Sequence, residues 1–412
     1  MKIAYLSVAP FVGSGYGVCT RYICHALAEK HDVTIFSYYG YEGSEIEFRI
    51  EDRDVRIVGG DATIFHPALA ERCREFDVCI FHLDSWMLSS YVSSLNGAKI
   101  IDWAVIDHEP LQRPYRDFAC SPAVKCIVPM SNFAVRQLKR CIDINQKKIA
   151  EPIPHGADPK LFYEEKDASL PFIPDDCEFL VCSVVDNLGI RENIPEMLEA
   201  FTIFMKECCR DAYMYMHALP TRRGGYNLYE VVSSLEEFYN VDVSSHLILR
   251  QSSSYYPTEF LRKIYSAADV LLMTIKGGSF EIPVIEAALC NTPSIVTEFS
   301  AMAEIIGEPV CELRDNIVEH ERGLAVKPAA FIWMTLTSSR QAVLNAEDVA
   351  EALRIYYENE SMRRKHASRM RAYVLKNLTW RHIGEKWLKL LDNFDDFMDE
   401  TYVDIRVERE KK

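Results

Sequence analysis

The chain has 412 residues and a formal net charge of −15, and 49% of its residues are hydrophobic. This length and composition are typical of a folded protein of two or three domains, and they exclude a disordered or collagen-like chain. The acidic balance excludes the overall basic field of a nucleic-acid-binding protein. We therefore expect no nucleic-acid partner and only a local site for any phosphate.

The first residues and the cysteines indicate the compartment. The first apolar run, Lys2–Val8, is too short for the core of a signal peptide, and no run in the sequence is long enough to span a membrane. The 13 cysteines are odd in number and include no Cys-x-x-Cys pair. We therefore expect reduced thiols in the core of a cytoplasmic protein without a transmembrane segment.

Apolar runs alternate with helical patterns in the first half of the chain, which predicts parallel strands connected by helices. An amphipathic helix is expected over Arg21–Lys30, and a proline-rich stretch, 151–178, predicts a linker. The expected strands are Lys2–Val8, Val33–Phe36, Phe76–Phe81, Lys99–Ile106 and Val124–Val128.

A second block of the same kind follows the linker, and it ends in three helical patterns. Its expected strands are Phe179–Val185, Ala212–Leu219, Leu247–Leu249, Val270–Thr274 and Ser294–Val296. Its expected helices are Ile194–Cys208, Pro283–Leu289, Asn345–Tyr357, Met362–Asn377 and Trp380–Leu391. The sequence thus predicts an α/β fold with two doubly wound, Rossmann-like sheets, which bind ligands at the carboxyl ends of their strands.

Two short motifs follow expected strands of the first block. Gly13-Ser14-Gly15-Tyr16-Gly17 precedes a helix expected from about Val18, where glycines let a phosphate approach the backbone and the helix N-terminus favours an anion. Its spacing is not Gly-x-Gly-x-x-Gly, so a plain glycine turn is the alternative. His108, in Ile106–Pro110, can hydrogen-bond a ligand hydroxyl or serve a structural role. A third motif, Ile153–Asp158, is expected to be a loop organised by its glycine and aspartate.

The fourth motif has the most definite chemistry. The strand in Ala268–Thr274 is followed by Gly277-Gly278, a proline-started helix and a second strand that ends at Val296. Unpaired N–H groups at the start of that helix can hold a diphosphate. Glu286, one turn into the helix, can accept hydrogen bonds from vicinal sugar hydroxyls.

This motif resembles the signature of glycosyltransferase family 4, whose members are retaining enzymes. The matching residues are Phe280, Pro283, Glu286, Ala287, Thr292 and Pro293. Gly15 to Gly17, His155–Asp158 and Tyr265–Val270 are similar to other elements of that family, so the resemblance covers nearly the whole chain. The chain is also similar to a glycosyltransferase encoded by large DNA viruses of algae, which would place it in the host cytoplasm.

The resemblance implies the GT-B fold, in which two Rossmann-like domains face each other across a cleft. Residues 1–165 form the acceptor-side domain, completed by a C-terminal helix over 380–412 that crosses back to it. Residues 166–379 form the donor-side domain. The implied donor-binding residues are Gly15, Gly17, Phe280, Glu281, Ile282 and Glu286, and His108 is the implied catalytic histidine near the donor sugar.

Three positions depart from the family pattern. Gly278 stands where the family has the first signature glutamate, eight residues before Glu286. Asn187 and Glu192 stand where it has a phosphate-binding arginine and lysine. Positioned positive charge stabilises a leaving diphosphate, so these departures bear directly on catalysis.

Nearby residues can substitute for the missing groups. Arg191 is adjacent to one lost cation, and Lys276 and Arg223 are further candidates for binding the diphosphate. Glu281 replaces the missing carboxylate if the turn is rearranged. We therefore expect His108, Glu281 and Arg191 as catalytic residues.

The expected function is transfer of a hexose from a nucleoside diphosphate sugar to a hydroxyl of a glycan or glycoconjugate, with retention of configuration. The family favours GDP-mannose as donor, followed by UDP-glucose. No cofactor or metal is expected, because the one Asp-x-Asp motif, Asp52-Arg53-Asp54, is read as a loop. A homodimer is compatible with the sequence.

Three alternatives stay open. A nucleotide-sugar epimerase of the same fold would alter the donor without transferring it. A non-catalytic nucleotide-sugar-binding protein would explain the departures at Gly278, Asn187 and Glu192. A dehydrogenase would use the glycines from Gly13 to Gly17 for a nicotinamide cofactor.

Overall fold

The chain forms two units, and each unit is built around one large sheet of mainly parallel strands. The computed structural model describes residues 1–61, 64–95, 97–166, 168–250, 256–335 and 337–398. Unit 1 is built mainly from Met1–Gly156 together with the chain from Trp380 onward. Unit 2 comprises Ala157–Trp333 and Arg340–Thr379.

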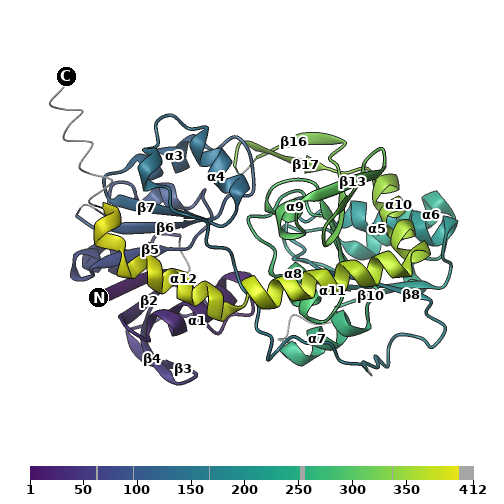
Figure 1. The fold of residues 1–412 in the computed structure, drawn as a ribbon, viewed down its shortest axis with the longest axis horizontal. Coiled ribbons are helices and arrows are strands. Elements are labelled where there is room, and N and C mark those ends of the chain that lie inside the picture. The colour runs from purple at the N-terminus through teal and green to yellow at the C-terminus, as the bar shows by residue number, and fades with distance from the viewer. Residues whose placement is uncertain (62–63, 96, 167, 251–255, 336, 399–412) are drawn as a thin grey trace. The chain divides into compact units, whose positions relative to one another are not determined.

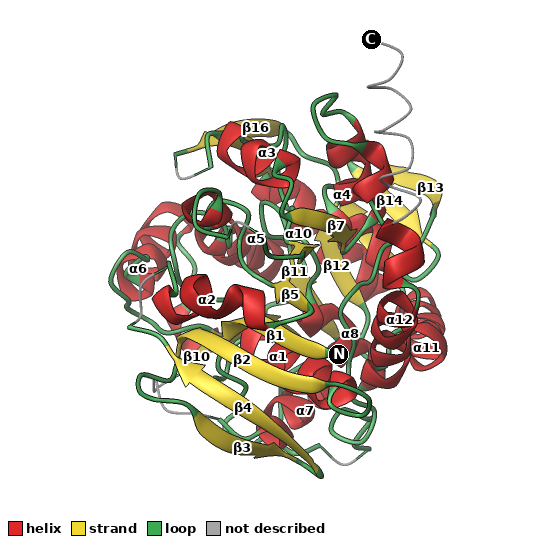
Figure 2. Ribbon diagram, turned by 90° about the vertical axis from the view of Figure 1, so that its left-hand side faces the viewer, coloured by secondary structure: helices red, strands yellow, loops and turns green. Residues whose placement is uncertain are grey.

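Unit 1 contains a seven-stranded sheet in the order β3-β4-β2-β1-β5-β6-β7, and Figure 2 shows β1 to β4 of this sheet side by side. Its strands are β1 (Lys2–Val8), β2 (Asp32–Tyr39), β3 (Ile46–Ile50), β4 (Arg53–Gly59), β5 (Val78–Phe81), β6 (Ile100–Ala104) and β7 (Val124–Pro129). All pairs are parallel except β3 with β4, which form a hairpin at the edge. The almost continuous burial of β1, β5 and β6 fits strands that are covered on both faces.

The helices of unit 1 begin where the sequence offers a cap. Ser14 precedes α1 and accepts a hydrogen bond from the N–H of Gly17 at 3.2 Å, and Ser131 caps α4 in the same way. The helices are α1 (Gly15–Leu27), α2 (Pro67–Arg72), α3 (Arg113–Cys120), α4 (Asn132–Lys139) and α12 (Trp380–Asp392). Short 3₁₀ turns lie at Cys73–Glu75, Leu88–Tyr91 and Gln146–Lys148.

The C-terminal helix α12 packs against α1 within unit 1 (Figure 1). The rings of Tyr22 and Trp380 stack with centroids 4.9 Å apart and an interplanar angle of 5°. Trp387 meets Trp103 of β6 edge to face, with centroids 5.3 Å apart. Gly384 permits the close approach, because a Cβ there would fall 2.7 Å from the Cβ of Ala26. The C-terminal helix therefore completes the N-terminal unit, as the GT-B fold requires.

Unit 2 contains an eight-stranded sheet in the order β10-β9-β8-β11-β12-β15-β14-β13. Its strands are β8 (Phe179–Val184), β9 (Ala212–His217), β10 (Leu247–Leu249), β11 (Val270–Met273), β12 (Ser294–Thr297), β13 (Pro309–Arg314), β14 (Ile317–His320) and β15 (Gly323–Val326). The strands from β10 to β15 in this order are parallel, and β14 and β13 add antiparallel strands at one edge.

Helices connect the strands of unit 2 and cover its sheet. They are α5 (Ile194–Glu207), α6 (Leu228–Tyr239), α7 (Thr258–Ala267), α8 (Ile282–Leu289), α9 (Ala301–Ile305), α10 (Ala346–Glu358) and α11 (Glu360–Asn377), with a 3₁₀ turn at Ser244–His246. A separate two-stranded sheet pairs β16 (Ala330–Met334) with β17 (Ser339–Val343). The eight residues of α8 bury six side chains, so this helix is part of the core of unit 2.

Each sheet has one point where the chain reverses its direction of travel. In unit 1 the chain moves from β1 outward to β2, and then returns to β5 on the other side of β1. In unit 2 it moves from β8 to β9 and β10, and then returns to β11 beside β8. Such switch points open a crevice at the carboxyl ends of the strands, and ligands of doubly wound sheets bind in this crevice.

The expected strands and helices of both blocks are confirmed, with shifts at their ends. The helix expected from Val18 begins at Gly15, because Ser14 supplies its cap, and it ends at Leu27 rather than Lys30. The prediction that Asp52-Arg53-Asp54 is a loop was wrong in part, because Arg53 and Asp54 belong to β4 and only Asp52 lies in the turn. The cysteines are all unbridged and most are buried, as expected.

Candidate functional site

The start of α8 lies at the switch point of unit 2. Glu281 is the residue before the helix, and its side chain does not cap the helix. The side chains of Phe280 and Ile282 are buried. These two residues therefore offer a ligand only their backbone groups. In the first turn, Pro283 has no N–H group, and the N–H of Val284 donates to the carbonyl of Glu281 at 3.2 Å.

The side chain of Glu281 lies over Gly278. A Cβ built on Gly278 would fall 2.3 Å from Oε1 of Glu281 and 3.0 Å from its Cγ and Cδ. The N–H of Gly278 donates to the hydroxyl of Ser300 at 3.0 Å, and its carbonyl accepts from Ala301 at 3.2 Å, so the turn is fixed. The Glu281 carboxylate thus occupies the space that a side chain at position 278 would need.

Arg191 comes to the same turn from the loop between β8 and α5. Its Nη1 donates to the carbonyl of Gly277 at 3.1 Å and lies 4.0 Å from Oε1 of Glu281. Its Nη2 forms an ion pair with Glu192, whose carboxylate is almost fully buried. The Arg191 side chain keeps 40% exposure, so part of it remains accessible to solvent and to a ligand.

Lys276 is the second cation of this cluster, and it is buried with 3% side-chain exposure. Its Nζ donates to the side chain of Asn193 and to Oε1 of Glu196, the latter at 2.8 Å. Its backbone N–H donates to the carbonyl of Arg191 at 2.9 Å, which joins the two loops of the switch point. Each cation therefore already has a carboxylate beside it, and the negative charge of the chain extends into this site.

Two further positions bear on the binding of a phosphate. Asn187 stands where the family has a cation, and Arg223 is a candidate cation. The amide of Asn187 donates to the carbonyls of Leu219 and Tyr226 at 2.9 and 2.8 Å, and its oxygen accepts from the N–H of Tyr226 at 2.9 Å. Asn187 thus fixes the loop between β9 and α6. Arg223 is an exposed residue of that loop, which is joined to the loop after β8 by a bond from Gly189 N to Gly224 O at 2.8 Å.

Glu286 lies in the second turn of α8 and is partly buried. The hydroxyl of Tyr265 in α7 donates to its Oε2 at 3.3 Å. Burial raises the pKa of Glu286 to about 8, and the Tyr265 hydrogen bond acts in the opposite direction. The raised pKa therefore favours the protonated form of this carboxyl group near neutral pH.

The glycines of unit 1 have two different roles. Gly17 is buried, and a Cβ there would fall 2.2 Å from the carbonyl oxygen of Val12, so only glycine fits. Gly15 is exposed in the first turn of α1. Gly15 is thus the one of the two that presents backbone to a ligand, whereas Gly17 is required by packing.

His108 follows β6 and is 1% exposed. Its Nδ1 lies 2.7 Å from Oδ1 of Asp107, and its Nε2 is buried without a hydrogen-bond partner in the part of the chain that the structure describes. An Asp107 carboxylate places the proton of the neutral ring on Nδ1, so Nε2 presents its lone pair. The histidine therefore has one ring nitrogen available for a ligand.

Some predicted residues are thus brought together and others are not. Direct contacts join Arg191 to Glu281, and Lys276 is joined to Arg191 through the backbone. Glu286 lies further along α8, Arg223 lies on a neighbouring loop, and Gly15, Gly17 and His108 belong to unit 1. The sequence missed the residues that hold these groups, Asn193, Glu196, Tyr265, Ser300 and Asp107. Their contacts are long-range in sequence, except for Asp107, whose position beside His108 was the one available signal.

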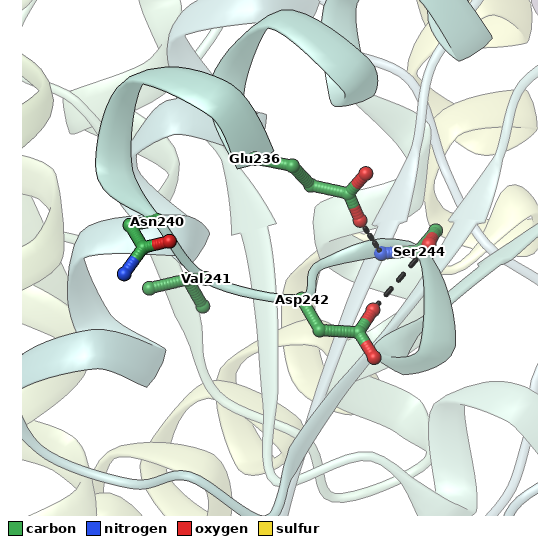
Figure 3. A pocket seen from close by; sticks show the side chains of 5 residues that line it. All are labelled: Glu236, Asn240, Val241, Asp242 and Ser244. Atoms are coloured by element: carbon green, nitrogen blue, oxygen red, sulfur yellow. Dashed lines mark hydrogen bonds between the residues drawn. The ribbon is translucent and has the colours of Figure 1, made fainter.

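A hollow between α6 and β10 is lined by Val241 and four polar residues, Glu236, Asn240, Asp242 and Ser244 (Figure 3). Glu236 accepts the N–H groups of Val243 and Ser244 at 2.9 and 2.7 Å, and Asp242 accepts the hydroxyl of Ser245 at 2.6 Å. These carboxylates stabilise the turn that precedes β10. The hollow is therefore explained by local structure.

Solved structures share this architecture over almost the whole chain. A sucrose-phosphate synthase from Thermosynechococcus elongatus matches 96% of this chain and 99% of its own, with a TM-score of 0.69 at 17% identity. HepE from Anabaena, in complex with UDP and glucose, matches 95% and 100%, with a TM-score of 0.68 at 12% identity. A UDP-forming α,α-trehalose-phosphate synthase from Burkholderia xenovorans matches 95% and 98%, with a TM-score of 0.67 at 13% identity.

These likenesses confirm the expected GT-B fold. No family model matches the chain, and no curated protein matches it. Membership of family 4 and the viral resemblance therefore stay predictions. Among the described residues, no helix is both long and apolar enough to cross a membrane.

Proposed function

We propose that this protein is a glycosyltransferase that moves a hexose from a nucleoside diphosphate sugar to a hydroxyl of a glycan or glycoconjugate, with retention of configuration. The observation that carries the proposal is the cluster at the switch point of unit 2. There the start of α8, the Arg191 guanidinium and the Glu281 carboxylate meet in one turn. Backbone amides, a cation and an acceptor of sugar hydroxyls are the groups that a nucleoside diphosphate sugar requires.

Each residue has a distinct part in this proposal. Arg191 and the N–H groups at the start of α8 hold the diphosphate. Lys276 helps to position Arg191, because its backbone N–H donates to the carbonyl of Arg191. Glu281 accepts hydrogen bonds from the sugar, and Glu286 accepts those of the ribose hydroxyls. By resemblance to the family, Gly15 and His108 of unit 1 are further proposed donor-binding residues.

The reaction breaks the bond between the anomeric carbon and the diphosphate oxygen, and forms a bond from that carbon to the acceptor oxygen. The proton of the acceptor hydroxyl passes to the released nucleoside diphosphate. The protein contributes orientation and fixed charges that stabilise the leaving group. We propose that no metal ion or other cofactor takes part, and that the Arg191 guanidinium and the backbone amides at the start of α8 stabilise the leaving group.

GDP-mannose and UDP-glucose are the proposed donors. Family frequency favours GDP-mannose. The neighbours favour UDP-glucose, since HepE was solved with UDP-glucose and the Burkholderia synthase is named as UDP-forming. Both donors therefore belong in the first experiment.

The test is a panel of nucleotide sugars, scored by the shift in unfolding midpoint and by release of nucleoside diphosphate with and without glycan acceptors. Stabilisation by one donor, and transfer of its sugar to an acceptor, is the expected result. Failure of every nucleotide sugar to stabilise the protein would overturn the proposal. An altered donor without transfer would identify an epimerase, and binding without turnover a non-catalytic protein.

A further inference from the structure

Three side chains of metal-binding types meet in the core of unit 1. Cys19 lies in α1, His82 directly follows β5, and His155 lies close to the end of the first long segment of this unit. The three residues are 0%, 1% and 7% exposed. The sulfur of Cys19 and one ring nitrogen of each histidine all lie within 4.8 Å of one another. A thiol and two imidazoles gathered in this way are a ligand set for a transition metal.

The backbone of unit 1 fixes the positions of these residues. The N–H of His82 donates to the carbonyl of Leu6 at 3.0 Å, which continues the pairing of β1 with β5. The carbonyl of Ile153 accepts the indole N–H of Trp103 in β6 at 2.8 Å, so the segment that carries His155 is attached to the same sheet. Helix α1, which carries the cysteine, packs against β1. The cluster is therefore built by the fold of one unit.

Both histidines are in the form that binds metals. Burial lowers the pKa of His155 to about 3, and burial and then the neighbouring His155 lower the pKa of His82 well below its ordinary value, so both rings are neutral. The hydroxyl of Tyr5 lies 3.1 Å from Nδ1 of His82. If Tyr5 accepts the proton of Nδ1, then Nε2 presents its lone pair. A hydrogen bond on the opposite ring nitrogen is the usual way in which a metal-binding histidine is oriented.

The surroundings of the cluster suit a soft metal ion. The ring of Trp103 covers both histidines, with centroids 4.4 Å from His82 and 5.1 Å from His155. Within the described part of the chain, no carboxylate contributes to the pKa shifts of the two histidines or of Cys19. A hard ion such as Mg²⁺ or Ca²⁺ would lack carboxylate ligands here, whereas thiolate and imidazole suit Zn²⁺ and Cu⁺.

We propose that Cys19, His82 and His155 bind one soft metal ion, Zn²⁺ or Cu⁺, in the core of unit 1. Burial raises the pKa of the Cys19 thiol, which therefore carries its proton until an ion binds. This proton then leaves to solvent, and the ion bonds to the thiolate and to one nitrogen of each imidazole. Bonds of about 2.0–2.3 Å place the ligand atoms about 3.3–3.8 Å apart, so the side chains shift by about 1 Å to close on the ion.

The ion has a structural role in this proposal. Its bonds connect α1, the end of β5 and the segment that carries His155, so it stabilises unit 1 against unfolding. The transfer reaction proposed above does not use it. The two proposals can therefore fail independently, because metal content and unfolding are measured without donor or acceptor.

The test starts from the full chain, purified without a metal-affinity step and then freed of metal by dialysis against a chelator. The chain is titrated with Zn²⁺, and with Cu⁺ under reducing conditions without oxygen, each in competition with a chelator of known affinity. We expect one equivalent of one of these ions to bind with a submicromolar Kd and to raise the unfolding midpoint. The ion that binds more tightly, and that mass spectrometry finds in the purified chain, identifies the metal.

Three results of these titrations overturn the inference. The first is failure of both ions to bind at one equivalent. The second is binding that leaves the unfolding midpoint unchanged. The third is an equal rise of the midpoint with Mg²⁺, which a site of one thiolate and two imidazoles does not bind.

The variants Cys19→Ser and His155→Gln each remove one ligand and keep a side chain of similar size. Each should bind the ion at least tenfold more weakly and lose the rise in midpoint that the ion causes. The Co²⁺-loaded natural chain should show thiolate-to-metal charge-transfer absorption, which a merely structural cysteine would not produce. If Cys19→Ser does not fold, His155→Gln and this absorption decide the question. Natural affinity in either variant, or no such absorption in the natural chain, overturns the inference.

Two control variants show whether the ion is bound elsewhere. Cys126→Ser replaces a buried thiol of β7 outside the cluster. His25→Gln removes a histidine from an exposed group of possible ligands, which also contains Glu51 and Asp52. Both variants should bind the ion as the natural chain does. Loss of binding in His25→Gln, with binding kept in Cys19→Ser, assigns the ion to the surface and overturns the inference.

Discussion

The carboxylate of Glu281 lies over Gly278, with Oε1 2.3 Å from where a Cβ at position 278 would be. The two positions therefore share one space, and a side chain at 278 excludes the observed position of Glu281. This relationship gives a physical reason for the glycine. It also supports the proposal that Glu281 takes the part of the carboxylate that the family pattern has at 278.

Gly278→Ala should lower transferase activity about tenfold or more while changing the unfolding midpoint little. The new methyl group displaces the end of a flexible side chain rather than backbone, so the stability cost should stay within about 1 kcal/mol. The displaced carboxylate can no longer meet the donor sugar. Steady-state kinetics with donor and acceptor measure the effect.

A double-mutant comparison tests the cause of that loss. If Gly278→Ala acts through Glu281, then adding it to Glu281→Gln should cause little further loss. Additive losses in the double variant would show that the two positions act separately. The pair Gly278→Glu with Glu281→Gly restores the family arrangement and should recover part of the activity.

Arg191→Ala should weaken binding of the nucleoside diphosphate about tenfold, because a partly exposed guanidinium at the start of α8 is lost. Arg223→Ala should have a smaller effect, since Arg223 is an exposed residue on the next loop. Calorimetric titration with UDP and GDP gives both values. Arg113→Ala, an 83% exposed arginine of unit 1, is the control. A larger loss for Arg223→Ala would transfer the phosphate assignment to that residue.

Glu192→Gln should have the opposite effect to Arg191→Ala and strengthen binding of the nucleoside diphosphate by a few-fold. Glu192 forms an ion pair with the guanidinium of Arg191, and its carboxylate is almost fully buried. Removing its charge leaves Arg191 with more positive potential for a phosphate. The same titration measures the change, and weaker binding would show that the Glu192 carboxylate is needed to position Arg191.

Much of the fold was predictable, whereas half of the site was not. Pro283 and the apolar run behind it identified α8, and alternating apolar runs identified the parallel strands. The sequence patterns did not predict the edge strands β3 and β13, because their side chains are largely exposed and show little periodicity in hydrophobicity. The position of Glu281 in the turn led to the prediction that it takes the part of the missing carboxylate; the structure places its side chain over Gly278, and the functional role stays a prediction.

The roles of Asn187 and Lys276 could not be read from the sequence. In the sequence, Asn187 stands where the family has a phosphate-binding cation. In the structure, its hydrogen-bond partners lie 32 and 39 residues away on the loop after β9. Lys276 appeared as a free candidate cation, but it is buried against residues 83 and 80 positions earlier. Long-range pairing of this kind depends on strand order, which a local pattern does not specify.

Asn187→Arg should therefore destabilise unit 2 and not improve donor binding. The substitution removes three hydrogen bonds to Leu219 and Tyr226 and leaves their buried backbone groups without partners, at a cost of about 2 kcal/mol or more. The unfolding midpoint and UDP titration measure the two effects. Arg222→Ala on the same loop, which loses only an exposed ion pair, is the control. Tighter UDP binding by Asn187→Arg would contradict the structural role.

Glu286 predicts a pH dependence of nucleotide binding. Burial raises its pKa to about 8, so the folded protein holds this proton between about pH 4.5 and 8, where the unfolded chain releases it. The corresponding contribution to folding stability is therefore lost as the pH rises through that range. Ribose hydroxyls bind best to the ionised carboxylate, so nucleotide affinity should rise between pH 6 and pH 8, by up to about tenfold per unit.

Nucleotide binding tests this better than stability does. Burial also raises the pKa of Asp102 in unit 1 to about 7, so Asp102 makes a similar contribution to the pH dependence of unfolding. Titrations of UDP and GDP at pH 6, 7 and 8 should show the rise in the natural protein and a flat profile in Glu286→Gln. Asp102→Asn should keep the rise, since its carboxyl group is bonded to Tyr115 within unit 1. If nucleotide affinity rises with pH in Glu286→Gln as it does in the natural protein, then Glu286 does not bind the ribose.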